Sequence, residues 1–95
     1  LGPFLKDLAQ LKESSPALFQ AFSEFRLEPK RSEEIEVLCF TAQTAVPVRI
    51  NARLGKEGAT MIMRVLDMLA AGDGFGTVRE IDFRSRNVIV KKGDD

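Results

Sequence analysis

Apolar residues recur at helical spacing at the start of the chain. They are Phe4, Leu5, Leu8 and Leu11. Pro3 suits the first position of a helix, so the spacing predicts an amphipathic helix that begins there. Ser15 as an N-cap, followed by Pro16 at the first helical position, then predicts a second, shorter helix over residues 16–20.

The pattern changes to alternation after the second helix. Residues 23–28, 34–41 and 46–50 alternate apolar and polar side chains, and polar stretches separate them. We predict three strands, of which the second and third form an antiparallel hairpin. Pro47 has no N–H to donate, which predicts that its strand lies at a sheet edge or that this position points away from a neighbour.

The second half of the chain predicts one long helix and two further strands. The apolar face of the helix comprises Met61, Ile62, Val65, Leu66 and Leu69. Glycines between residues 72 and 76 end the helix, and residues 78–84 and 87–91 are typical of strands. The order α-α-β-β-β-α-β-β predicts an α+β fold, in which an antiparallel or mixed sheet of about five strands carries helices on one face.

Composition fits one globular domain over residues 1–95, with 44% hydrophobic and 29% charged residues. Lys and Arg equal Asp and Glu at 14 each, so no broad positive field draws the domain to nucleic acid. Histidine is absent and Cys39 is the only thiol, so no Cys/His metal site or internal disulfide is expected. The start, Leu1-Gly2-Pro3, has neither an initiator Met nor a signal-peptide core, and we expect a piece of a longer protein.

Two clusters invite a catalytic or ligand-binding interpretation, and each has a simpler one. The glycines at 72, 74 and 76 follow a helix instead of preceding one, which favours a helix stop over a phosphate loop. Glu34 and Glu36, beside Glu33, share the polar side of a strand and are expected to face solvent. With no recognisable nucleophile motif either, we expect no enzyme and no cofactor.

Sulfur-containing side chains are expected to pack in the core. Cys39 alternates with Ile35 and Val37, which predicts a buried position. The three methionines of the long helix are expected to pack, with Met63 as the one that could be exposed.

Positive charge is concentrated near the end of the chain. Residues 79–92 contain Arg79, Arg84, Arg86, Lys91 and Lys92 against Glu80 and Asp82. Such cations can protect an edge strand against aggregation, which the local sequence favours. Alternatively, the edge is held open for the strand of an acidic partner.

In their order, these segments resemble the β domain of the FtsQ/DivIB family of bacterial cell-division proteins. The likeness rests on the opening helix, the Pro-Ala-Leu helix that runs into residues 22–27, the hairpin, the Leu- and Met-rich helix, and Ile81-Asp82-Phe83-Arg84 before a final apolar strand. It covers most of the 95 residues. The chain departs from the enterobacterial pattern, which has tyrosines around the binding strand, because it has Glu80 and Ser85 there and no Tyr or Trp.

The resemblance implies a parent protein with one membrane span and a POTRA domain, anchored in the cell inner membrane and facing the periplasm. This domain would be a monomeric scaffold that binds the division proteins FtsB and FtsL by strand addition at its C-terminal edge. The implied partner-binding residues are Arg84, Asn87, Val88, Ile89, Val90 and Lys91, with Asp82, Ser85 and Arg86 as further candidates. A proline at Ile89 is then expected to abolish partner binding.

Two other functions fit the same pattern. A scaffold domain of a secretion or pilus assembly platform would self-associate in sedimentation experiments. A small-molecule sensor that uses the open sheet face and the glycine loop at 72–76 would be stabilised by a ligand in a thermal-shift screen.

Overall fold

The computed structural model describes residues 2–31, 34–85 and 87–93. Its elements follow the predicted order: α1 (Gly2–Ser14), α2 (Pro16–Gln20), β1 (Phe22–Pro29), β2 (Ile35–Thr41), β3 (Val48–Asn51), α3 (Lys56–Ala71), β4 (Val78–Asp82) and β5 (Ile89–Lys92). The helices and the five-stranded mixed sheet confirm the predicted α+β fold.

The sheet has the strand order β1-β2-β3-β4-β5, so each strand lies beside its neighbours in sequence. Three of its junctions are antiparallel, and the predicted hairpin of β2 and β3 is one of them. The junction of β3 and β4 is parallel, because α3 crosses over between these two strands. Pro47 lies just before β3, and its carbonyl accepts a hydrogen bond from the N–H of Ile81 in β4.

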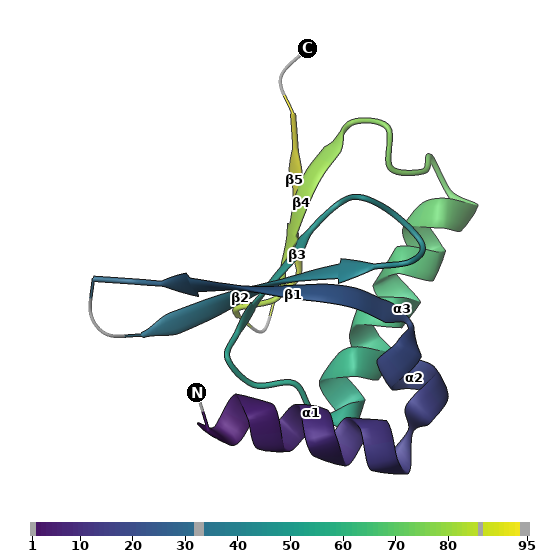
Figure 1. Ribbon diagram of the computed structural model, residues 1–95. Coiled ribbons are helices and arrows are strands. Elements are labelled where there is room, and N and C mark those ends of the chain that lie inside the picture. The colour runs from purple at the N-terminus through teal and green to yellow at the C-terminus, as the bar shows by residue number, and fades with distance from the viewer. Residues whose placement is uncertain (1, 32–33, 86, 94–95) are drawn as a thin grey trace.

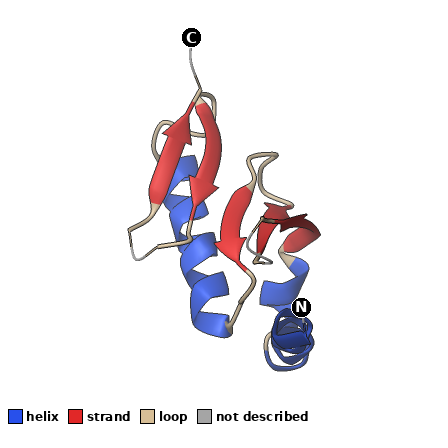
Figure 2. Ribbon diagram, turned by 90° about the vertical axis from the view of Figure 1, so that its left-hand side faces the viewer, coloured by secondary structure: helices blue, strands red, loops and turns tan. Residues whose placement is uncertain are grey.

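The helices cover one side of the sheet and leave the other side open (Figures 1 and 2). The core lies between these layers, where Val48 of β3 pairs with Ile81 of β4 and both are fully buried. Ile62 and Leu66 of α3 are buried over them. At the other end of the sheet, the ring of Phe4 in α1 meets the ring of Phe25 in β1 edge-to-face at 5.7 Å. Cys39 is fully buried as predicted.

The glycine loop after α3 ends the helix. The N–H of Gly72 donates to the carbonyls of Met68 and Leu69, and the N–H of Gly74 donates to the carbonyl of Leu69. These bonds satisfy carbonyls that lack partners inside the helix. Gly74 has φ +77°, a conformation that favours glycine. The loop therefore presents the carbonyl end of a helix, as the helix-stop interpretation predicts.

The prediction for the methionines of α3 was wrong. Met63 packs against the core, whereas Met61 and Met68 are exposed at 44% and 69%. The reason is geometric: at about 100° per residue, Met63 lies beside the buried Ile62 and Leu66, and the other two lie on the far flank. The apolar face predicted from the sequence therefore wrongly included Met61.

Candidate protein-binding edge and its charged neighbour

Strand β5 lies at one end of the sheet and pairs with β4. Neighbouring residues of a strand direct their backbone N–H and C=O groups to opposite sides. The N–H of Ile81 donates to the carbonyl of Pro47, just before β3, and the N–H of Phe83 donates to the carbonyl of Arg49 in β3. The backbone groups of Glu80 and Asp82 therefore face β5. Their register partners, Ile89 and Lys91, therefore face β4.

The outward row of β5 consists of the remaining two residues, Val90 and Lys92. The bond from the N–H of Gly93 to Thr77 fits the same alternation, because it places Gly93 on the inward row with Lys91. Within the described ranges, no backbone hydrogen bond between chain segments involves Val90 or Lys92 on the outer side. Two N–H groups and two C=O groups are thus presented to a further strand.

The direction of these backbone groups shows that Ile89 is the wrong position for a proline that tests partner binding. The N–H of Ile89 faces β4, so a proline there breaks the domain's own ladder. Val90 is the position at which a proline removes an outward donor and leaves the β4–β5 pairing intact.

The other predicted site residues are divided between the strand and the turn before it. Asn87 and Val88 precede β5, which begins at Ile89 instead of residue 87. The hydroxyl of Ser85 donates to the carbonyl of Asn87 at 3.0 Å and so closes this turn, which keeps Asn87 out of the strand. Arg86 lies outside the described residues. Val88 and Ile89 are exposed at 38% and 48%.

Asp82 and Arg84 form a tight local pair. Nη2 of Arg84 lies 2.6 Å from Oδ2 of Asp82, and the backbone N–H of Arg84 also donates to the Asp82 carboxylate. These bonds, opposed by burial, lower the pKa of Asp82 to about 2. Nη1 of Arg84 donates to Glu36 of β2 at 2.7 Å. Arg84 thus binds two carboxylates of its own chain, with which a partner's carboxylate would have to compete.

Arg49 of β3 is the centre of a larger ion-pair network on the open face. Its guanidinium donates twice to Glu80 of β4, at 3.0 and 3.1 Å. Nη1 donates to Glu28 of β1 at 2.6 Å and to Glu36 of β2 at 3.1 Å. The side chains of Arg49, Glu36 and Glu80 are only about 15% exposed. The predicted solvated face of Glu36 was therefore wrong, because cations from distant parts of the chain cover it.

Lys91 joins β5 to this network. Its Nζ lies 3.2 Å from Glu80 and 3.5 Å from Asp82. Arg49 above all, and Lys91 with it, lower the pKa of Glu80, while burial opposes them. Among the described residues, four carboxylates and four cations take part: Glu28, Glu36, Glu80 and Asp82 with Lys30, Arg49, Arg84 and Lys91. The open face is thus neutralised from β1 to β5, which fixes the strands and leaves little net charge for a ligand.

Strand β1 lies at the opposite end of the sheet and is the competing edge. It has a register irregularity between Phe22 and Glu24 and ends at Pro29, and both features are common protections of natural edges. The backbone N–H of Lys30 donates to the backbone carbonyl of Glu34 and so points toward β2. Because backbone groups alternate along a strand, the N–H of Leu27, three residues earlier, points away from β2. Exposed charges at Glu24 and Arg26 add to the protection. These features favour β5 as the binding edge.

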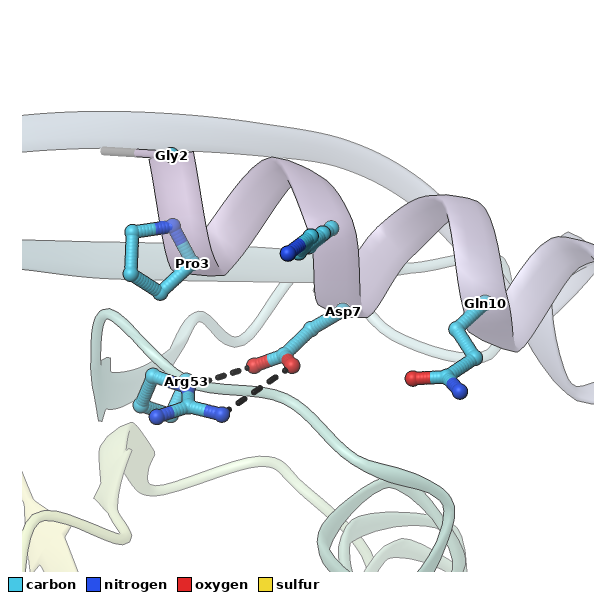
Figure 3. A pocket seen from close by; sticks show the side chains of 6 residues that line it. Gly2, Pro3, Asp7, Gln10 and Arg53 are labelled. Atoms are coloured by element: carbon cyan, nitrogen blue, oxygen red, sulfur yellow. Dashed lines mark hydrogen bonds and ion pairs between the residues drawn. The ribbon is translucent and has the colours of Figure 1, made fainter.

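A hollow beside α1 has a structural explanation (Figure 3). It measures about 560 Å³ and is lined by residues of α1 and by Arg53. Asp7 accepts from Nε and Nη2 of Arg53 at 2.8 and 3.3 Å and from the N–H of Leu54 at 2.9 Å. The bonds from Arg53 lower the pKa of Asp7 against the effect of burial. The pair ties α1 to the segment after β3, and in the described chain no group of three His, Cys, Asp or Glu side chains forms a metal site.

Comparisons with protein-family models, curated proteins and solved structures gave no match. Among residues 2–31, 34–85 and 87–93, no helix has the length and apolarity to cross a bilayer.

Proposed function

We propose that this domain is a non-catalytic scaffold module that binds another protein by strand addition at β5. The observation that carries the proposal is the outward row of Val90 and Lys92, whose backbone groups have no strand beside them in the described part of the sheet. Each main-chain hydrogen bond to this row adds about 0.5–1.5 kcal/mol, so the edge alone supports modest and reversible binding.

The biological setting follows from the resemblance to FtsQ/DivIB. We infer a divisome scaffold on the periplasmic side of the cell inner membrane, which binds FtsB- and FtsL-like proteins during septum formation. The edge position of β5 supports this inference, because strand addition in that family uses the C-terminal edge. Among the carried-over site residues, Val90 contributes outward backbone groups, whereas Arg84 and Asp82 bind one another and support the turn.

Matched proline variants test the proposal. Val90→Pro removes an outward N–H from β5, and Leu27→Pro removes an outward N–H from the protected edge β1. Binding to purified extracytoplasmic segments of the FtsB- and FtsL-like proteins of the same organism is measured by calorimetry, and circular dichroism checks that both variants fold. We expect Val90→Pro to weaken binding at least about tenfold and Leu27→Pro to leave it unchanged.

Two results would contradict the proposal. One is full affinity in the folded Val90→Pro variant, which would show that the outward row of β5 is not used. The other is a loss confined to Leu27→Pro, which would move the binding edge to β1.

A further inference from the structure

Exposed apolar side chains are concentrated around the β5 edge. Six large apolar residues of the described chain are exposed, and four of them are Met61, Met68, Val88 and Ile89. Val88 precedes β5, Ile89 is its first residue, and the two methionines lie on α3. The strand register and the contacts of α3 decide which of these side chains a partner strand meets on each side of the sheet.

The register with β4 divides the side chains of β5 between the two sides of the sheet. Val90 pairs with Ile81, which is fully buried under the helices, so Val90 points to the helix side. Lys92 lies two residues further along the strand and shares that side. Ile89 pairs with Asp82, a member of the ion-pair network, so Ile89 points to the open side. Each side of β5 therefore has one apolar residue.

The open side favours an uncharged partner. Lys91, which shares this side with Ile89, lies 3.2 Å from Glu80 and 3.5 Å from Asp82, so its charge is already balanced. A further carboxylate beside Lys91 would compete with these two, and a further cation would be repelled. Ile89 is exposed at 48%, and its surface is removed from water most favourably by an apolar neighbour. Apolar side chains therefore suit both open-side positions.

The helix side is apolar as far as Lys92. Asp67 of α3 accepts a hydrogen bond from Gln43, in the connection between β2 and β3, so that flank of α3 faces the β2 side. At about 100° per residue, Met61 and Met68 fall on the opposite flank. Figure 2 shows α3 directly behind β4 and β5, so this flank lies toward the β5 edge. A partner side chain on the helix side therefore meets apolar surface.

Lys92 marks the end of this apolar surface. Its side chain is exposed, and within the described ranges no ion pair involves it, in contrast to Lys91. Side chains directly opposite one another on paired strands interact, and opposite charges stabilise the pair whereas like charges destabilise it. Lys92 thus favours a carboxylate at this one helix-side position of a partner strand and disfavours a cation there.

We propose that the partner segment is an apolar strand that ends in a carboxylate, with apolar side chains opposite Ile89, Val90 and Lys91 and an acidic side chain opposite Lys92. This proposal rests on the proposed function, since it requires strand addition at β5. Strands that are covered on both faces are typically continuous apolar runs. The CH₂ groups of Lys91 offer such a strand an apolar stem on the open side. Recognition then depends on where the carboxylate lies, and a partner that is merely acidic does not suffice.

Palindromic peptides test this order of residues in either strand direction. The probe has the core Glu-Val-Ile-Val-Glu, and blocked termini remove the terminal charges. The comparison peptide Val-Glu-Ile-Glu-Val has the same composition, but no register of it offers three apolar residues in a row. Titrations followed by the amide signals of Val90 and Lys92 give the affinities. We expect the comparison peptide to bind about tenfold more weakly, and equal or tighter binding overturns the proposal.

Reversal of charge tests the acidic position. A peptide with the core Lys-Val-Ile-Val-Lys should bind the wild-type domain about fivefold more weakly than the probe. In Lys92→Glu this order should be reversed, because a lysine of the peptide then lies opposite a carboxylate. The matched control is Lys12→Glu on α1, which changes the net charge equally and should keep the wild-type order. An unchanged order in Lys92→Glu overturns the acidic part.

A substitution at Ile89 tests the open-side contact. Ile89→Thr keeps a β-branched side chain in β5 and removes apolar surface, so it should weaken binding of the probe about fivefold. The matched control is Leu27→Thr, because Leu27 is exposed at 43% on the opposite edge strand, and its affinity should equal that of the wild type. Full affinity of Ile89→Thr, or no binding of the probe to the wild type at millimolar concentration, overturns the inference.

The failure of this inference is distinct from a failure of the proposed function. Where Val90→Pro abolishes binding of the FtsB- and FtsL-like segments and the peptides bind equally, strand addition stands and the order of partner residues is wrong. Where Val90→Pro keeps the affinity for those segments, the proposed function itself is wrong.

Discussion

Replacing Arg49 by methionine should destabilise the domain strongly. The side chain is 15% exposed and donates to Glu28, Glu36 and Glu80 from three different strands. Methionine keeps much of the apolar length and removes the charge, so three carboxylates lose a partner. Breaking a buried ion pair from one side costs about 3–5 kcal/mol. Because Glu36 and Glu80 keep other cations nearby, we expect the lower limit, a loss of about 3 kcal/mol.

The loss should depend on pH. The pKa values of Glu36 and Glu80 are lowered in the folded state, so these groups stabilise the fold above the ordinary carboxylate pKa of about 4. That contribution disappears as the pH falls through the lowered values. The Arg49→Met variant lacks most of this contribution, so the difference in free energy of unfolding between wild type and variant should shrink between pH 7 and pH 3.

Urea unfolding followed by far-ultraviolet circular dichroism measures this difference. Urea is uncharged and does not screen ion pairs, and the chain has no Trp or Tyr to report by fluorescence. Arg26→Met is the matched control, because Arg26 pairs with Glu24 at the surface and lies over the ring of Phe40. We expect it to cost less than about 1 kcal/mol. An Arg49→Met variant within about 1 kcal/mol of the wild type, or a difference that stays constant down to pH 3, would refute the reasoning.

Three further predictions concern other buried groups. Asp82→Asn should lower the free energy of unfolding by about 2 kcal/mol at pH 7, because the pKa of Asp82 is lowered to about 2 in the folded state. Urea unfolding should show that wild type and variant become equally stable as the pH falls to about 2. The thiol of Cys39, whose pKa burial raises to about 12, should react with a disulfide reagent at pH 8 only after urea unfolding; reaction at the rate of a free thiol in the native state would contradict this. Asp7→Asn should lower Tm by about 5 °C through loss of the pair with Arg53, whereas the exposed Asp73→Asn should leave Tm unchanged; equal Tm values would count against a structural role for the pair.

Most of the fold was predictable because the local patterns were clear. Helical spacing gave α3, alternation gave β2 and β3, and the glycines at 72–76 gave the end of α3. The first residue of β5 was not predictable from an apolar run, because the Ser85–Asn87 hydrogen bond holds Asn87 in a turn. Met61 was misassigned because three adjacent apolar residues at 61–63 leave the centre of the buried face undefined in the sequence.

The candidate site was predictable only in part. The edge position of the last strand was predicted from the cations around it and from the family resemblance, and the structure places β5 at an edge. The network around Glu36 was missed, since Arg49 and Arg84 come from 13 and 48 positions away in the chain. The outward direction of Val90 depends on the register between β4 and β5, which includes an irregularity between Val78 and Glu80 that alternation does not reveal.

Amide hydrogen exchange along β5, resolved by nuclear magnetic resonance, tests the vacant edge most directly. In the free domain we expect the amides of Ile89 and Lys91, which face β4, to exchange slowly, and those of Val90 and Lys92 to exchange quickly. Addition of a purified FtsB- or FtsL-like extracytoplasmic segment should then slow the exchange of Val90 and Lys92 selectively. Equal protection of all four amides in the free domain would contradict the account, because the outward row would already be bonded.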